Sequence, residues 1–518
     1  MAWASQIAPA YMAAIRVLAC QYNGALVCPV QEHYIVIPDT FLHESFSPDA
    51  FAMLRDDLQG SAFLPSDADF AGAILTWSLG TRHEPAIVVL PESAHDVVCA
   101  MRFAHDHDLP VAVQGTGHGM PVACTGGMLI NTQRMRGVEI DPERRIARVE
   151  AGAKWSHVIP LAHEYGLAPL CGSSSDVGVV GYTLGGGHGW LARRHGRAAE
   201  RIVAADIVTA RGDLIHVSAE SNPDLLDALR GGSGNFGIVT SLEVGLVPVS
   251  HVYGGAVFYS LEDARAVFGA FNTWTKDLPE SITAGISIMR FPPLPMLPPP
   301  LQGAACVVVR ACACEDLDAA EQIIEPMRRL TTPLMDTFGA LPFSAIDAIS
   351  MDPTDPMPVA GRTLMLDSLD EAQVEALLSV AGPGIESPVL MVEVRYLGNS
   401  GAYAREHGTA LAAPYVVYAI GVTGAPEAHV AVSGALEGIA GALAPFASDR
   451  VLLNFLGDGD VGEHRTRAAF DAEEYLRLQQ VKTTYDPGNR FRFNHNILPM
   501  RIVVDAPTSR PGMPGRLV

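Results

Sequence analysis

Two glycine-rich stretches constrain the fold of this chain more than any other feature of its sequence. The first, Gly115-Thr116-Gly117-His118-Gly119, directly follows a predicted strand at residues 109–113, and the second covers residues 172–189. A glycine cluster at a strand end leaves backbone N–H groups free to converge on an anion, and it lets the main chain approach a pyrophosphate closely. Glycine is also the usual residue of tight turns, so the first loop alone leaves both interpretations open.

The hydrophobic pattern predicts an α+β fold in which strands and helices are mixed without strict alternation. In the first half we expect strands at 86–90, 109–113, 128–131, 137–141, 146–151, 202–209, 214–217 and from 237, with helices at 97–105, 154–165 and 223–230. From residue 253 longer strands, at 254–258, 284–289, 305–309, 389–395 and 415–421, are interleaved with Ala-rich helices. This second pattern predicts an antiparallel sheet covered by helices on one side.

The length of 518 residues exceeds what one hydrophobic core supports, so we expect two or three packed units. We divide the chain into an N-terminal extension (1–57), a first domain (58–249), a second domain (250–449), a return to the first domain (450–499) and a tail (500–518). Two proline-rich segments, 291–302 and 352–358, should be loops rather than strands.

The acidic balance of the chain argues against nucleic acid and membrane partners. Thirty-five Lys and Arg against 57 Asp and Glu give a net charge of −22, which repels phosphate backbones and acidic membrane surfaces. The eight cysteines are scattered, and Cys312-Ala-Cys314 lacks the two-residue gap of metal and redox pairs, so we expect reduced, mostly buried thiols. No basic cluster precedes the apolar stretch at residues 13–28, and we expect a cytoplasmic protein.

One motif imitates a dinucleotide-binding fingerprint. Residues 232–237 match the GxGxxG pattern, but that fingerprint follows a strand and opens a helix. Here the motif follows the predicted helix at 223–230 and enters the strand at Ile238-Val239-Thr240. The sequence therefore does not support NAD(P) binding.

The order of these motifs resembles the PCMH-type FAD-binding domain of the vanillyl-alcohol-oxidase superfamily. The likeness rests on Gly-Thr-Gly-His-Gly at 115–119, on the second loop at 176–189 and on the motif at 231–240. Near the C-terminus, Tyr475, Leu478, Val481-Lys482 and residues 485–494 resemble the closing segment of the berberine-bridge-enzyme-like branch. The resemblance covers about residues 58–249 and 450–499 and implies that the first domain binds FAD and the second binds the substrate.

The resemblance also implies which residues hold the cofactor. His118 matches the histidine that family members join covalently to the flavin 8α-methyl group, a link that raises the flavin potential and prevents loss of the cofactor. Other positions implied to contact FAD are Gln114, Gly115, Thr116, Gly117, Gly119, Ser174, Val177, Gly178, Gly181, Gly186, Gly189, Ile238, Val239 and Asn494. The alternative is a loop histidine that contacts the cofactor without bonding to it.

Some family members carry a second flavin link from a cysteine, and this sequence has Ser174 at the matching position. Cys171 lies three residues earlier, out of register, and its simplest interpretation is a buried thiol. The resemblance therefore implies a single link, through His118, as in the amine-oxidising members of the family.

The catalytic base is not fixed by the sequence. A flavin oxidation usually needs a group that takes a substrate proton, and this group should lie on the sheet of the second domain. Along residues 391–396, strand alternation places Glu393 and Arg395 on one face and Tyr396 on the other, and either face could be the relevant one. Further candidates are Tyr415, Tyr418, Tyr475 and His407. The spacing of His188 and His195 fits neither a helical metal pair nor a zinc motif, so we expect no metal site.

These features together favour an FAD-dependent oxidase. It would transfer a hydride from a small-molecule or secondary-metabolite alcohol, amine or sugar to FAD, with O₂ as the acceptor and H₂O₂ as the product. Two alternatives stay open: a flavin dehydrogenase that uses another acceptor, and a flavin-holding protein that catalyses a redox-neutral cyclisation or only binds a ligand.

Overall fold

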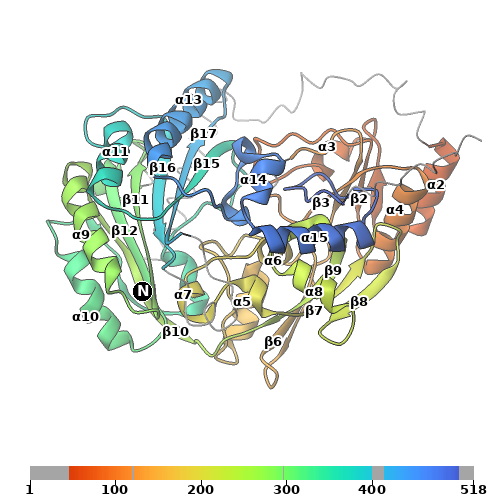
Figure 1. Ribbon diagram of the computed structural model, residues 1–518, viewed down its shortest axis with the longest axis horizontal. Coiled ribbons are helices and arrows are strands. Elements are labelled where there is room, and N and C mark those ends of the chain that lie inside the picture. Colours follow the sequence, from red (N-terminus) through yellow and green to blue (C-terminus); the bar gives the residue numbers. More distant parts are fainter. Residues whose placement is uncertain (1–45, 120–121, 296, 399–412, 501–518) are drawn as a thin grey trace, which may run out of the picture.

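The computed structural model describes residues 46–119, 122–295, 297–398 and 413–500. Two bodies of secondary structure lie side by side (Figure 1). One contains residues before about 250 together with the C-terminal helices, and the other contains a large sheet with its covering helices. The mixed α+β fold with an antiparallel sheet covered by helices confirms the fold class expected from the sequence.

The first glycine loop extends from a small sheet of four strands in the order β1-β2-β4-β3. These strands are β1 (Ser61–Phe63), β2 (Ile87–Leu90), β3 (Val111–Gln114) and β4 (Met128–Asn131), and β4 pairs in parallel with both β2 and β3. Their aliphatic residues pack against α2 (Pro48–Asp57) and α4 (Ala94–Asp106). Ser93 caps α4, because its hydroxyl accepts the N–H of Asp96 at 3.3 Å.

A second sheet of five antiparallel strands continues the first body, in the order β5-β6-β9-β7-β8. Its strands are β5 (Val138–Asp141), β6 (Ile146–Glu150), β7 (Ile202–Val208), β8 (Leu214–Ser218) and β9 (Ile238–Gly245). The first body also contains four helices of this part of the chain: α5 (Trp155–His163), α6 (Val179–Leu184), α7 (Ala192–His195) and α8 (Pro223–Leu229). Trp155 and Phe236 are fully buried in the core between these elements.

The second body is an eight-stranded antiparallel sheet in the order β13-β10-β12-β11-β16-β17-β15, with β14 paired to β10. Its strands are β10 (His251–Ser260), β11 (Ile282–Arg290), β12 (Ala305–Ala313), β13 (Met335–Asp336), β14 (Gly339–Pro342), β15 (Val359–Leu366), β16 (Val389–Tyr396) and β17 (Tyr415–Val422). Four helices cover its outer side in Figure 1: α9 (Ala264–Lys276), α10 (Leu317–Arg328), α11 (Glu371–Ala381) and α13 (Pro426–Leu443).

Strand alternation gives this sheet two different faces. Val392 and Val394 of β16 belong to the core under the helices, as do the even-numbered residues of β11 from Ile282 to Ile288. The intervening residues form the inner face, which looks toward the first body. By length and composition α13 is apolar enough to cross a membrane, and its residues Val432, Leu436 and Ile439 pack onto the sheet.

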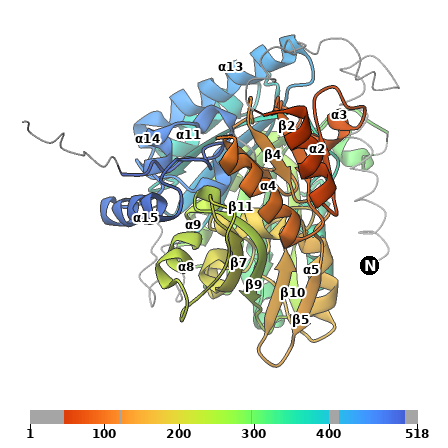
Figure 2. The same ribbon diagram turned by 90° about the vertical axis from the view of Figure 1, so that its right-hand side faces the viewer.

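The C-terminal segment returns to the first body. Helix α15 (Ala472–Tyr485) packs on α8, as Figure 2 also shows. Beyond it, the carbonyl of Arg490 accepts the N–H of Val111 at 2.9 Å, at the start of the strand that leads into the first glycine loop. The C-terminal segment therefore holds the strand that leads into the first glycine loop.

Candidate active site

The first loop cannot carry a side chain at Gly117. This residue has φ +77°, and an added Cβ would lie 2.5 Å from Thr76 Oγ1. The Thr76 hydroxyl donates to the Gly117 carbonyl at 2.7 Å, and the N–H of Ser78 donates to the same carbonyl at 3.1 Å. Glycine is thus required by both conformation and close approach.

The second loop lies directly against the first. The N–H of Gly178 donates to Thr116 Oγ1 at 3.3 Å, and an added Cβ at Gly178 would come within 3.3 Å of the same threonine side chain. The start of α5 fixes the second loop, because the N–H of Trp155 donates to the Val177 carbonyl at 3.1 Å. Two glycine stretches far apart in sequence therefore form one surface.

His118 is held between an aromatic ring and a carboxylate. The Trp77 ring stacks on its imidazole at 4.3 Å between centroids, with 17° between the planes. His118 Nε2 lies 3.3 Å from Asp176 Oδ2, and Lys154 Nζ lies 2.6 Å from Asp176 Oδ1. Burial would raise the pKa of Asp176, but hydrogen bonds from His118 and Lys154 outweigh it and lower the pKa below its ordinary value. Asp176 is therefore a carboxylate that accepts from both neighbours.

The remaining predicted loop residues are placed as follows. The Gln114 side chain is buried, where it bonds His83 at 3.1 Å and the Leu75 carbonyl at 2.7 Å. Ser174 is buried, and its hydroxyl accepts the N–H of Asp176 at 3.3 Å. Ile238 and Val239 are buried in β9. Side chains are excluded at Gly186, which has φ +118°, and at Gly189, where a Cβ would meet the Cys171 carbonyl.

The motif at 231–237 follows α8 and enters β9, which agrees with its exclusion as a dinucleotide fingerprint. Its buried Asn235 is bound by the C-terminal segment: Asn235 Oδ1 accepts the N–H of Ile497 at 2.9 Å, and its carbonyl accepts from Lys482 Nζ at 2.8 Å. Lys482 is fully buried and also bonds Asp486 at 2.8 Å. Asn494 Nδ2 donates to the Gly234 carbonyl at 3.2 Å. These bonds join the third motif to the closing segment.

The residues around the loops fit a large cofactor rich in oxygen and nitrogen. The buried polar atoms that lack a partner in the described ranges include Tyr182 Oη, Trp190 Nε1, both ring nitrogens of His188, and the Oδ1 atoms of Asn494 and Asn496. Space is open at Gly119 and Gly181, where an added Cβ would meet nothing within 4 Å. Buried donors and acceptors normally find partners, so these atoms mark where bound FAD would complete the hydrogen bonding.

The inner face of the large sheet carries charged groups opposite these loops. Glu393 and Arg395 are both buried and form an ion pair at 2.9 Å. The Arg395 guanidinium lies 5.5 Å from the Trp190 ring, at the end of the second glycine loop, and 5.6 Å from Phe455. Glu393 stands opposite Ser287 of β11 and Tyr418 of β17 in the strand register. Of the two faces that alternation left open, the one with Glu393 and Arg395 faces the glycine loops.

Of the other candidate side chains, Tyr396, Tyr415 and Tyr475 lie apart from this cluster. Tyr396 and Tyr415 belong to the helix-covered face, where Tyr415 bonds Thr275 at 3.2 Å and the Arg193 guanidinium lies 4.7 Å from the Tyr396 ring. Tyr475 packs in the core of the first body against Phe470. Tyr418 shares the inner face, with its ring 6.3 Å from Phe455. His407 lies outside the described residues.

The cysteines in the described ranges are all free, and most are buried. Burial raises the pKa of the Cys171 thiol well above its ordinary value. A buried neutral thiol is a poor nucleophile, so the structure gives Cys171 no sign of reactivity.

His188 and His495 are buried in a neutral state. Burial, and then repulsion from Arg395, Arg197 and Arg193, lowers the pKa of His188 to about 3, and burial lowers the pKa of His495 to about 4. No group of three or more His, Cys, Asp and Glu that could hold a metal ion gathers in the part of the chain that the structure describes.

These two histidines predict acid sensitivity. Below about pH 6.5 each of these histidines is protonated in the unfolded chain but stays neutral in the folded protein. The free energy of unfolding should therefore fall by about 1.4 kcal/mol per pH unit for each histidine, until the pH reaches its pKa in the folded protein. Urea unfolding at several pH values between about 7.5 and 5 measures this slope. The variant His188→Asn should have a shallower slope, and an unchanged slope would contradict the assignment.

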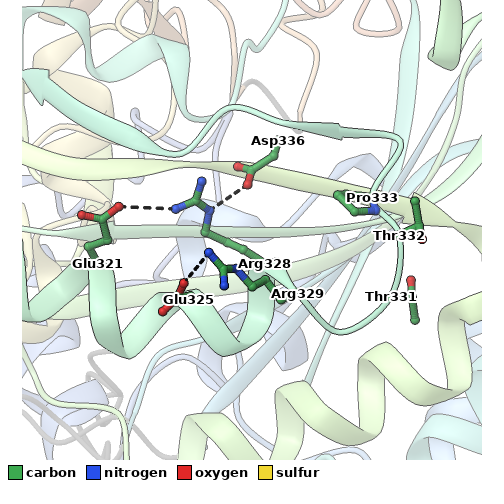
Figure 3. Close-up of a pocket in the computed structure, with 8 residues that line it drawn as sticks. All are labelled: Glu321, Glu325, Arg328, Arg329, Thr331, Thr332, Pro333 and Asp336. Carbon is green, nitrogen blue, oxygen red and sulfur yellow. Dashed lines mark hydrogen bonds and ion pairs between the residues drawn. The ribbon is translucent and has the colours of Figure 1, made fainter.

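A separate surface hollow of about 540 Å³ lies at the end of α10 (Figure 3). Its charged side chains are already paired: Arg328 with Asp336 at 2.7 Å and Arg329 with Glu325 at 2.7 Å. None of the residues that line it belongs to the glycine loops or to the inner face cluster. The hollow is therefore not the candidate active site.

Trp77, Lys154 and Asp176 are site residues that sequence motifs do not reveal. No pattern marks Trp77, and Lys154 precedes an ordinary helix. The one available signal is the carboxylate of Asp176, two residues before Gly178 of the second loop. Its pairing with His118 depends on the contact between the two loops, which only the fold provides.

Comparisons with known proteins show which domains and relatives this chain resembles. The family model described as FAD binding domain matches residues 85–218, and the model described as berberine and berberine like matches residues 453–498. (R)-6-hydroxynicotine oxidase of Paenarthrobacter nicotinovorans is 26% identical over 461 residues, which cover 85% of this chain and 97% of that protein. An uncharacterised FAD-linked oxidoreductase of Bacillus subtilis is 24% identical over 462 residues, 87% of this chain and 99% of that protein.

Solved structures show the same fold. The structure of 6-hydroxy-D-nicotine oxidase from Arthrobacter nicotinovorans has a TM-score of 0.75 at 25% identity and covers 85% of this chain and 98% of its own. A chitooligosaccharide oxidase has a TM-score of 0.73 at 18% identity, covers 87% and 100%, and shows the fold alone. With both family models matched in chain order and the glycine loops joined in one surface, the chain is an FAD-linked oxidoreductase with an FAD binding domain and a berberine-like C-terminal segment, which agrees with the resemblance to the vanillyl-alcohol-oxidase superfamily.

Proposed function

We propose that this enzyme is an oxidase that removes a hydride from an alcohol, amine or sugar and returns the electrons to O₂, producing H₂O₂. Bound FAD would supply the hydride acceptor and the route of the electrons to O₂. The observation that carries the proposal is the buried Glu393–Arg395 pair on the inner face, directly opposite the glycine loops. The relative named (R)-6-hydroxynicotine oxidase supports an oxidase reaction on a small molecule.

In this proposal Glu393 accepts the proton that the substrate O–H or N–H loses during oxidation. Arg395 positions the carboxylate, because its Nη2 bonds both Glu393 oxygens, at 2.9 and 3.3 Å. The rings of Trp190 and Phe455 flank the Arg395 guanidinium, and both members of the pair are buried. A base held in this way needs little rearrangement when the substrate arrives.

We further propose that His118 is the sole covalent anchor of FAD. The Asp176 carboxylate accepts from Nε2–H of His118, which leaves the lone pair on Nδ1 as the nucleophile. Nδ1 of His118 would hold the flavin through its 8α carbon, in place of one hydrogen of that carbon, and bound FAD would supply the oxidising equivalents for this exchange, with O₂ as the final acceptor of two electrons and two protons. The imidazole gains a positive charge in this bond, and the adjacent Asp176 carboxylate stabilises it.

The variant Asp176→Asn should attach flavin roughly 10- to 100-fold more slowly, the effect of one hydrogen bond to a charged group worth about 1.5–3 kcal/mol. Flavin fluorescence of the protein band on a denaturing gel, followed over time after FAD is added to the apoprotein, measures attachment. Asp347→Asn is the matched control, because Asp347 accepts from Ser175 of the same loop and is not among the partners of His118. Equal attachment rates in both variants would contradict the role of Asp176.

The reaction class is tested on purified protein with a panel of amines, alcohols and sugars. A substrate should bleach the flavin absorbance without air, and air should restore it with stoichiometric H₂O₂. Restoration only by an added dye would show a dehydrogenase, and product formed without bleaching would show redox-neutral chemistry. A cytoplasmic location belongs to the same proposal and is tested by cell fractionation.

A further inference from the structure

The inner face carries a second buried arginine that the proposed reaction does not use. Arg310 of β12 is only 5% exposed, and its Nη1 donates to Ser287 Oγ at 2.8 Å. Its Nη2 contacts the Met289 sulfur at 3.0 Å. We infer that Arg310 binds the anionic oxygen of a substrate, so that the substrate is a carboxylate or a related oxyanion. This inference rests on the proposed function, since it specifies the substrate of that site.

The charges of the inner face do not balance without such a group. Glu393 is already paired with Arg395, and Arg310 has no carboxylate within ion-pair distance anywhere in the described ranges. Arg310 Nε is buried and has no hydrogen-bond partner there. An isolated buried charge is costly, and it is normally compensated by a counter-charge that also takes its free donors.

The space beside Arg310 suits one oxygen atom. A cavity of about 10 Å³ touches Arg310 and is otherwise lined mainly by apolar side chains, among them Met289, Met335 and Met351. A volume of that size holds about one water-sized group. The proline-rich segment, through Pro298 and Leu301, closes one side of it. In our proposal only the anionic end of the ligand reaches Arg310, and the rest of the ligand lies outside this cavity.

The strand register connects Arg310 to Glu393. Arg310 of β12 stands opposite Gly285 of β11, and Ser287, which accepts from Arg310, stands opposite Glu393 of β16. No side chain of Gly285 intervenes, and the Glu393 carboxylate extends toward this glycine. Two strand spacings, roughly 10 Å, separate β12 from β16. A small acid lying across β11 could place its anionic end at Arg310 and its oxidised carbon near Glu393.

The test uses the FAD-loaded full chain in chloride-free buffer and two matched pairs of probes, acetate with acetamide and benzoate with benzamide. Each is titrated while the flavin difference spectrum is recorded. At least one acid should perturb the spectrum more tightly than its amide, and Arg310→Met should weaken the binding of that acid roughly 30-fold or more. Arg310→Lys should retain part of the preference, because it keeps the charge.

Arg290→Met is the matched control, since Arg290 lies on β11 and donates to the Ala381 carbonyl at the end of α11, away from the inner face. This variant should keep the acid preference. Acids that bind no better than their amides, or an Arg310→Met variant that binds as the wild type does, would overturn the inference.

Two further results distinguish a substrate site at Arg310 from a site for an inorganic ion. In the first, chloride or phosphate raises the melting temperature of the wild type but not that of Arg310→Met, and neither acid alters the flavin spectrum. Arg310 then holds an inorganic ion, and the substrate assignment is wrong. A protein without flavin would refute the proposed function. In that case the melting temperature tests the anion site. The acids should raise the melting temperature of the wild type, whereas the amides should not, and neither should raise that of Arg310→Met.

Discussion

Glu393→Gln should reduce the flavin about 10²- to 10⁴-fold more slowly than the wild type under anaerobic conditions, the usual contribution of a general base. Glutamine has almost the shape of glutamate and can still contact Arg395, but it cannot take up the substrate proton. Flavin content should be unchanged, because Glu393 lies on the sheet and not in the glycine loops. Stopped-flow reduction with a substrate from the panel measures the rate.

Two variants show whether the loss reflects chemistry or packing. Glu393→Asp keeps the carboxylate and should recover part of the rate, whereas a purely structural role would make it as poor as glutamine. Tyr418→Phe removes the other candidate proton acceptor on the inner face. If Glu393→Gln reduced the flavin at nearly the wild-type rate and Tyr418→Phe reduced it slowly, Tyr418 and not Glu393 would be the proton acceptor.

Lys482→Met should lower the free energy of unfolding by about 3–5 kcal/mol, the cost of leaving one partner of a buried ion pair without the other. Asp486 would stay fully buried, with its Oδ2 still accepting the N–H of Phe491 at 2.9 Å but without the ammonium at 2.8 Å. The carbonyls of Asn235 and Phe491 would also lose a donor. Urea unfolding followed by tryptophan fluorescence gives the free energy.

The same variant should bind FAD more weakly, because Lys482 joins the closing segment to the motif that Asn494 also contacts. The double variant Lys482→Met with Asp486→Asn should be less unstable than the single one, since no buried charge is left over. Lys276→Met, an exposed lysine 3.8 Å from Asp370, is the control and should change stability by well under about 1 kcal/mol. Equal losses from Lys482→Met and Lys276→Met would contradict the role of the buried pair.

The sequence anticipates the local elements well where the periodicity is strong. The predicted strand at 128–131 is β4 to the residue, and the predicted hairpin at 202–217 is β7 with β8. The strands β13, β14 and β15 are not anticipated, because β13 has only two residues, β14 is the segment Gly-Ala-Leu-Pro, and β15 follows the proline-rich segment at 352–358. Their pairing depends on neighbours that local propensity does not reveal.

The site is anticipated only in part, for a physical reason. Alternation shows that Glu393 and Arg395 share a face, yet both faces of this sheet are covered, so apolar residues such as Val392 and Met391 occupy both and do not mark the inner one. A lysine on a polar helix such as α15 is usually exposed, and nothing near Lys482 in the sequence shows that it reaches Asn235. Contacts between distant segments decide these roles.

The attachment of FAD to His118 is tested most directly by precipitating the purified protein with acid, digesting it with trypsin and locating the flavin by mass spectrometry. The yellow colour is expected to stay in the pellet, and the flavin mass to fall on His118 within the peptide 103–134, which also contains His105 and His107 as internal controls. His118→Ala should release any bound flavin into the supernatant. Flavin released from the wild type, or found on another residue, would contradict the assignment of His118 as the covalent anchor.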